Sequence, residues 1–121
     1  MNRAAGDRAA RERAGRRGEA LAAWWLRLKG WRIVARRVKT ARGEIDLIVR
    51  RGRMVAFVEV KWRDRRDDLD TAIDAWRLRR VAAAAEAVGA RYVRAGDSQR
   101  IDVVLLARRT FPRHIVNVWM P

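Results

Sequence analysis

Cysteine is absent from the 121-residue sequence, and histidine occurs once, at His114. The absence of cysteine excludes a disulfide-stabilised scaffold, a thiolate zinc site and a cysteine nucleophile. With one histidine, neither a multi-histidine metal site nor a Ser-His-Asp hydrolase is easy to assemble. No apolar run approaches the roughly 18 residues of a membrane-spanning helix, and no apolar stretch follows the first basic residues as in a secretory signal peptide. We therefore expect a cytoplasmic protein that does not cross a membrane.

Acidic residues are few relative to basic ones. The chain has 29 Lys and Arg against 14 Asp and Glu, a formal net charge of +15, while 50% of its residues are hydrophobic. That hydrophobic fraction can form a core, and a chain of this length allows a single domain. A compact domain with so strong a positive field attracts polyanions through counterion release. Nucleic acid is the predicted partner; a merely solvated basic surface and an acidic protein partner are the alternatives.

The pattern of apolar residues predicts an N-terminal arm followed by one folded domain. Residues 1–17 mix Arg, Ala and acids without a large apolar side chain, which predicts a flexible basic arm. Apolar residues at helical spacing predict one helix over 19–29, ended by Gly30, and another over 70–88, ended by Gly89. The tryptophans of these helices are expected in the core, as Trp24, Trp25 and Trp76.

The strands complete the predicted domain, which covers 18–121. β-Favouring runs predict strands over 31–38, 45–49, 54–60 and 101–107, with a weak edge strand over 114–119. The order helix, three strands, helix, strand predicts an α/β layered fold with a mixed central sheet, since a helical crossover joins parallel strands.

Acidic residues interrupt two otherwise apolar strands, in the segments GEIDLI (43–48) and FVEVK (57–61). A half-buried carboxylate needs a partner, because burying an unpaired polar group costs about 2 to 7 kcal/mol. Side chains alternate across a strand, so Glu59 and Lys61 share one face, and Glu44 and Asp46 share one face.

Whether these two faces coincide depends on the hairpin loop. A two-residue loop at Arg51-Gly52 pairs position 46 with 57 and 44 with 59, which places all four charged side chains on one face. A four-residue loop keeps this pairing, whereas a three-residue loop would send Asp46 and Glu59 to opposite faces. In the first arrangement, Asp46 is a diagonal neighbour of Glu59, and both carboxylates could bind one hard cation, Mg²⁺ or Mn²⁺.

Two carboxylates with a nearby lysine are the groups that a metal-dependent phosphodiesterase needs. The acids hold the metal ion, which neutralises a phosphate oxygen, and the lysine stabilises the charge that develops on phosphorus. The structural alternative is an ordinary salt bridge between these acids and Lys61 or one of the arginines. A compact ammonium in an Arg-rich chain favours the catalytic interpretation.

At these residues the sequence resembles a known family. A helix opening with Gly-Glu, the GEIDLI and FVEVK segments and a later Asp-Val-Val strand are similar to the small bacterial YraN family. That family is similar to restriction-endonuclease-like (PD-(D/E)xK) nucleases, most closely to archaeal Holliday junction resolvases. The resemblance covers residues 18–119 and implies a three-layer α/β sandwich of the restriction-endonuclease-like class. It implies catalytic roles for Asp46 (the first acid), Glu59 and Lys61 (the ExK pair) and Glu19 (the acid on the first helix), with Asp46 and Glu59 holding the metal ion.

The sequence departs from the family pattern at a few positions. Ile45 stands in place of the proline that names the nuclease motif, as the YraN pattern itself allows. Arg77 stands where the family usually has lysine, and Leu69-Asp70 replaces its typical Phe-Gly, so these departures affect substrate contacts more than the metal site.

The resemblance implies a Mg²⁺- or Mn²⁺-dependent endonuclease acting on DNA, including branched or structured DNA. Similar resolvases act as dimers, so a homodimer is one option. The alternative is a non-catalytic protein that binds DNA or structured RNA and retains the nuclease fold. Phosphate contacts are predicted at the densest basic patch, which comprises Arg63, Arg65, Arg66, Arg77, Arg79 and Arg80.

Three further residues are weaker candidates. His114 has no paired ligand nearby in the sequence and is predicted to be a surface or packing residue. Asp102 begins an apolar strand and could lie near the site, but it is predicted to act as a cap or to pair with Arg100 or Arg91. Glu44 lies within the GEIDLI motif without an assigned role.

Overall fold

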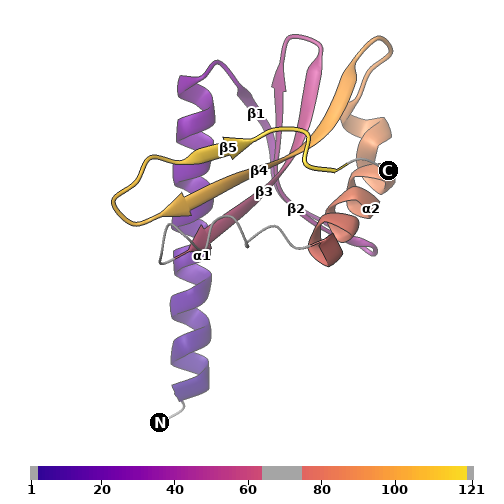
Figure 1. Ribbon diagram of the computed structural model, residues 1–121. Helices are drawn as coiled ribbons and strands as arrows, with labels where there is room; N and C mark the ends of the chain where they lie inside the picture. The colour runs from indigo at the N-terminus through magenta and orange to yellow at the C-terminus, as the bar shows by residue number, and fades with distance from the viewer. Residues whose placement is uncertain (1–2, 64–74, 120–121) are drawn as a thin grey trace.

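The computed structural model of the protein describes residues 3–63 and 75–119, with only the backbone given at 3–14, 63 and 75 (Figure 1). Five strands form one sheet in the order β1-β2-β3-β4-β5, in which β3 and β4 are parallel and the other neighbours antiparallel. This confirms the predicted element order and mixed sheet, with β5 as the edge strand. The elements are α1 (Arg3–Leu28), β1 (Arg32–Thr40), β2 (Gly43–Arg51), β3 (Met54–Arg63), α2 (Ala75–Tyr92), β4 (Ser98–Ala107) and β5 (Arg113–Ile115).

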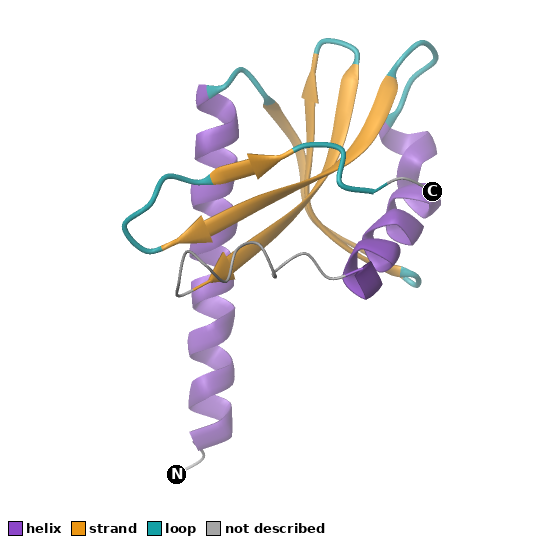
Figure 2. Ribbon diagram, viewed as in Figure 1, coloured by secondary structure: helices purple, strands orange, loops and turns teal. Residues whose placement is uncertain are grey.

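The two helices pack against opposite faces of the sheet and so make three layers (Figure 2). Leu78 of α2 belongs to the core cluster that contains Phe57, and Leu26 of α1 belongs to the cluster that contains Val58. Phe57 and Val58 are neighbours on β3, so they point to opposite faces. Glu59 and Lys61 follow the phase of Phe57 and therefore lie on the α2 face of the sheet.

Helix α1 is longer than predicted, because it begins at Arg3 and not near residue 18. Ala and Arg are strong helix formers, and a helix whose later turns are fixed by packing can propagate into a segment of such residues. The N-terminal part of α1 extends beyond the sheet (Figure 1). Among the described residues, neither helix is long and apolar enough to span a membrane.

The C-terminal end of α1 follows the prediction. Gly30 has a φ of 91° and its N–H donates to the carbonyl of Arg27 at 3.0 Å. The N–H of Trp31 donates to the carbonyl of Leu26, also at 3.0 Å, and the indole of Trp31 is buried in the same core cluster as Leu26. These two bonds form a Schellman motif, which needs a residue with positive φ and so favours glycine at position 30.

The β2–β3 hairpin has a different register from the predicted one. Arg51 pairs with Met54 and Leu47 with Val58, so the loop is Gly52-Arg53 and the prediction of Arg51-Gly52 is wrong. Gly52 has a φ of 61°, and a type II′ hairpin turn reserves such a φ for glycine at its first central position. Both loops have two residues, so the faces are preserved. Continuing this register places Asp46 opposite Glu59, whereas the predicted register placed it opposite Phe57.

Helix α2 ends later than predicted, at Tyr92 instead of before Gly89. A glycine inside a helix costs about 1 kcal/mol relative to alanine. Val88 and Tyr92 pack against the core on either side of Gly89, and this burial outweighs the cost. The start of α2 is seen at Ala75, and the predicted helical residues 70–74 lie outside the described part of the chain, as does Leu69-Asp70.

Gly43, the first residue of β2, is a point of close approach between the β1–β2 hairpin and α2. A Cβ atom placed on Gly43 would lie 2.6 Å from the carbonyl oxygen of Arg80, which is shorter than real Cβ contacts. The hydroxyl of Thr40 accepts the N–H of Gly43 at 3.0 Å and fixes the turn. The absence of a side chain at Gly43 therefore sets how closely α2 approaches Glu44.

We expect Gly43→Ala to lower the free energy of unfolding by about 1 to 3 kcal/mol, because the added methyl group must displace the α2 backbone. Gly15→Ala is the matched control, since a Cβ at Gly15 in α1 meets nothing within 4 Å. The control should gain about 0.5 to 1 kcal/mol from helix propensity. Urea unfolding measures both; an unchanged stability of Gly43→Ala would contradict the close approach.

Candidate functional site

Four carboxylates from three elements line one pocket of about 620 Å³: Glu19 of α1, Glu44 and Asp46 of β2, and Glu59 of β3. We call this the carboxylate pocket. The structure thus brings together the three acids for which catalytic roles were predicted, and adds Glu44. Basic residues complete the lining, namely Arg16, Arg37, Lys39 and Arg77.

Asp46 lies where β2 changes its packing. Ile45 joins the core on the α2 face and Leu47 the core on the α1 face, so regular alternation is interrupted between them. The Asp46 carboxylate accepts the N–H of Val60 at 2.8 Å and so binds the β3 backbone directly. Burial raises the pKa of Asp46, and the nearby charge of Glu59 raises it further, to about 7, although the Val60 N–H acts in the opposite direction. Near neutral pH, the carboxyl group of Asp46 is therefore partly protonated.

Glu59 is 3% exposed and is approached by two cations. Its Oε1 atom lies 2.9 Å from a guanidinium nitrogen of Arg77 and 3.4 Å from Nζ of Lys61. Within the described residues, however, the same oxygen receives no hydrogen bond. The two ion pairs thus have the distance but not the direction of hydrogen bonds, so the charge of this buried carboxylate is compensated without a donor aimed at Oε1.

Arg37 belongs to the pocket and was not predicted as a site residue. Its guanidinium Nε donates to the carboxylate of Glu19, and this bond is the main reason why the pKa of Arg37 is raised. Arg36 pairs with Leu47 and Val38 with Ile45, which places Arg37 opposite Asp46 in the β1–β2 hairpin. The register of that hairpin, had it been worked out from the sequence, would have revealed Arg37.

The backbone of Arg37 has a φ of 51°. A non-glycine residue in the left-handed region costs of order 1 to 3 kcal/mol and persists only where the surrounding structure enforces it.

The donor set fits a hard divalent cation. Mg²⁺ prefers oxygen ligands and is commonly held by one or two carboxylates together with water and substrate phosphates. Asp46 and Glu59 repel each other, and Glu59 has a buried oxygen without a hydrogen bond, so a cation between them would relieve both. In the described ranges, no three Asp, Glu or His side chains gather closely enough to hold a metal ion. A site of two carboxylates is therefore what this pocket offers.

The basic patch predicted to contact phosphates is described only in part. Arg77, Arg79 and Arg80 are exposed on the first turns of α2. Arg77 and Arg80 lie beside the carboxylate pocket, whereas Arg79 lines a different cavity. The side chain of Arg63, and the whole of Arg65 and Arg66, lie outside the described residues.

Asp102 and His114 form a buried polar cluster away from the carboxylate pocket. Asp102 pairs with Val58 in the sheet and so faces α1, opposite to Glu59. Its carboxylate accepts from Nε of Arg100 at 3.0 Å and from the N–H of Asn117 at 2.9 Å, and lies 2.7 Å from Nε2 of His114. The predicted pairing with Arg100 is confirmed. His114 is a packing residue with a buried partner, which the sequence did not reveal.

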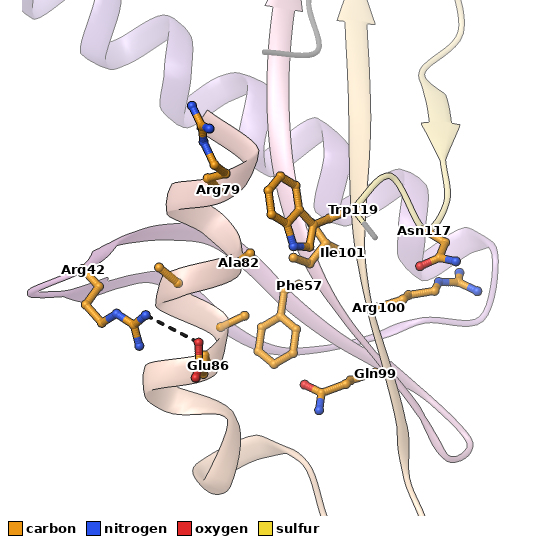
Figure 3. A pocket seen from close by; sticks show the side chains of 12 residues that line it. Arg42, Phe57, Arg79, Ala82, Glu86, Gln99, Arg100, Ile101, Asn117 and Trp119 are labelled. Carbon is orange, nitrogen blue, oxygen red and sulfur yellow. Dashed lines mark hydrogen bonds and ion pairs between the residues drawn. The ribbon is translucent and has the colours of Figure 1, made fainter. Parts of the chain in front are cut away.

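A second large cavity, of about 590 Å³, lies between α2 and the segment that follows β5 (Figure 3). Phe57 and Trp119 contribute to its largely apolar lining. Its one carboxylate, Glu86, is paired with Arg42 at 3.4 Å. This cavity lacks the paired carboxylates with which the carboxylate pocket could hold a cation.

The sequence of the chain matches a protein family. The family described as "Uncharacterised protein family UPF0102" matches residues 18–106. The chain belongs to this family. UPF0102 is the YraN family, so the resemblance seen in the sequence is confirmed. Two relatives, each called "UPF0102 protein", are 64% identical to this chain. The match to the protein of Sphingopyxis alaskensis covers 94% of this chain and 98% of the relative. The match to the protein of Erythrobacter litoralis covers 91% of this chain and 95% of the relative.

The fold also matches a solved structure, that of Hjc from Archaeoglobus fulgidus, a Holliday junction resolvase. The match has a TM-score of 0.58 and 18% sequence identity, and it covers 83% of this chain and 73% of the resolvase. At this identity the similarity concerns the fold. The predicted restriction-endonuclease-like sandwich is therefore confirmed for this UPF0102 chain.

Proposed function

We propose that this protein is an endonuclease that uses Mg²⁺ or Mn²⁺ to hydrolyse phosphodiester bonds in DNA, including branched or structured DNA. The observation that carries the proposal is the placement of Asp46 and Glu59, from neighbouring strands, in one pocket with cations around it. The fold shared with a DNA resolvase and the net charge of +15 support DNA as the substrate.

In this proposal, three acids of the pocket and Lys61, which lies next to Glu59, each have a task. Asp46 and Glu59 hold the cation, which when bound neutralises a non-bridging phosphate oxygen and lowers the pKa of a water molecule. Lys61, beside Glu59, donates to the phosphate oxygens as negative charge develops there. Glu19 accepts a hydrogen bond from the attacking water and orients it. Water adds to phosphorus and one P–O ester bond breaks, which leaves a phosphate on one end and a hydroxyl group on the other.

In this proposal, the side chain of Arg77 has different partners in the free and in the DNA-bound protein. Its side chain is 54% exposed, so its guanidinium can exchange the ion pair with Glu59 for one with a phosphate. The exchange frees the Glu59 oxygen for the cation when DNA arrives.

A second candidate function, nucleic-acid binding without catalysis, is favoured by one observation. Arg77 and Lys61 already lie on the Glu59 carboxylate, as in a purely structural ion-pair network. Such a protein needs only its arginines to bind DNA, and its stability would not respond to divalent cations.

A cleavage assay separates the two functions. Single-stranded, duplex, flapped and four-way DNA are incubated with wild-type protein in Mg²⁺, in Mn²⁺ and in chelator. We expect cleavage only with metal, and none by an identically purified Asp46→Asn protein. Glu86→Gln, which changes an exposed carboxylate outside the pocket, is the control and should cut like wild type. Absence of cleavage on all four substrates, with no metal-induced rise in melting temperature, would establish the non-catalytic function.

A further inference from the structure

Trp76, in the first turn of α2, is an exposed aromatic residue close to Glu44 and Glu59. The sequence predicted it in the core, but it is 57% exposed, so that prediction is wrong. Residues of an α-helix are about 100° apart, and Trp76 therefore lies roughly 200° around the helix from Leu78, which faces the core. Trp24 of α1, also predicted in the core, is likewise 57% exposed. Exposure thus follows from the phase of each helix.

Trp76 lines a small pocket of about 200 Å³ together with Glu44, Glu59, Arg77 and Arg80. Three of these residues, Glu44, Glu59 and Arg77, also line the carboxylate pocket, so the two pockets adjoin. The guanidinium of Arg80 lies 5.1 Å from the centroid of the Trp76 ring, a cation–π arrangement that orients the indole. A large ring therefore lies in a pocket that adjoins the carboxylate pocket and shares Glu59 with it.

An indole flanked by guanidinium groups has the chemistry of a base-stacking platform. Proteins that bind single strands combine aromatic side chains, on which bases stack, with arginines that track the phosphates. Arg77 and Arg80 are positioned for the second task beside Trp76. A base inside a continuous duplex is already stacked on both sides and must first be unstacked, whereas an unpaired base presents its face freely.

We infer that Trp76 stacks on an unpaired base next to the phosphate at Asp46 and Glu59, and that the protein selects DNA with an unpaired nucleotide at the cleaved position. The substrate class is a single-strand overhang or flap joined to a duplex. The inference rests on the proposed function, which it deepens by assigning a specificity-determining residue.

The experiment measures binding in chelator, where no cleavage occurs. A flapped DNA carries 2-aminopurine as its first unpaired base, and a fully paired duplex of the same sequence carries it within the helix. Wild type is compared with Trp76→Ala, with Trp76→Phe, and with Trp24→Ala as the matched control of equal exposure on the other helix.

We expect Trp76→Ala to bind the flap about tenfold to a hundredfold more weakly while its affinity for the duplex is unchanged. Trp76→Phe should keep most of the flap affinity, and Trp24→Ala should keep all of it. The fluorescence of 2-aminopurine should be quenched on binding by wild type and Trp76→Phe but not by Trp76→Ala. Melting temperatures of the variants confirm that each is folded.

Two results would overturn the inference: an unchanged flap affinity of Trp76→Ala, or an equal loss on flap and duplex. These outcomes are distinct from failure of the proposed function. A non-catalytic protein would show the stacking signal without cleavage in metal, whereas a nuclease without the platform would cut in metal with no effect of Trp76→Ala on flap binding.

Discussion

Asp46→Asn should abolish cleavage and at the same time stabilise the metal-free protein above neutral pH. A bound metal supplies several kcal/mol of transition-state stabilisation, and each 1.36 kcal/mol corresponds to a factor of ten in rate. Removing one of its two protein ligands should therefore reduce cleavage about a thousandfold or more. The Mg²⁺-induced rise in melting temperature should be lost with it.

The stability effect follows from the raised pKa of Asp46. Its folded value of about 7 lies above the ordinary value of 3.8, so between these values the folded state binds more protons than the unfolded state. Stability contributed by the protonated carboxyl group is full below about pH 4 and is lost as the pH rises through 7. A shift of this size corresponds to at most about 4 kcal/mol.

Chemical unfolding in chelator at about pH 5 and pH 8 tests this sign. At the lower pH the folded Asp46 is still largely protonated while the unfolded one is ionised, so the Asp46→Asn protein should exceed wild type in stability by less than it does at the higher pH. At the higher pH the variant should be the more stable, and it should bind DNA at least as tightly, because one charge that repels phosphate is gone. If Asp46 were instead a structural salt-bridge partner, the variant would be less stable and the metal response would be intact.

DNA affinity should fall by about a thousandfold or more between about 50 and 200 mM salt, as for proteins that neutralise six to ten phosphates. The net charge of +15 and the exposed arginines at the start of α2 are the physical reason. The logarithm of the association constant should fall linearly with the logarithm of salt concentration, with a slope of about −0.9 per phosphate contact.

Arg79→Gln and Arg80→Gln should each reduce the magnitude of this slope by about one. Arg91→Gln, in the last turn of the same helix, is the matched control and should leave the slope unchanged. Titrations at several salt concentrations, in chelator, give the slopes. An equal reduction by Arg91→Gln would show that a diffuse field, rather than a patch at the start of α2, attracts DNA.

Much of the fold was predictable because its signals are local. Apolar periodicity changes between strand and helix spacing along the chain, and this change gave the order of elements that the structure confirms. Gly30 ended the first helix as predicted because only glycine readily adopts the φ that a Schellman motif needs. The start of α1 could not be located in this way, since Arg and Ala favour helix whether or not they pack.

That Asp46 and Glu59 come together was predictable in part, because a two-residue loop keeps them on one face where alternation is regular, although alternation in β2 is interrupted between Ile45 and Leu47. The residue opposite Asp46 on β3 was not predictable. It depends on whether the loop is Arg51-Gly52 or Gly52-Arg53, and this choice is set by which loop position requires a positive φ. The observed pairing differs from the predicted one by two residues, so the residue opposite Asp46 is Glu59 instead of Phe57.

The sequence by itself thus determined the layered α/β fold, the two strands that carry the acids and the face on which those acids lie. Only the tertiary structure decided which distant groups surround them: Arg37 on Glu19, Arg77 on Glu59, and the exposed indole of Trp76 at the pocket edge. The raised pKa of Asp46 was also decided by the tertiary structure, since it arises from burial and from the charge of Glu59. Periodicity and turn chemistry act within a few residues along the chain, whereas these contacts join elements whose distances and phases are set only when both helices pack on the sheet.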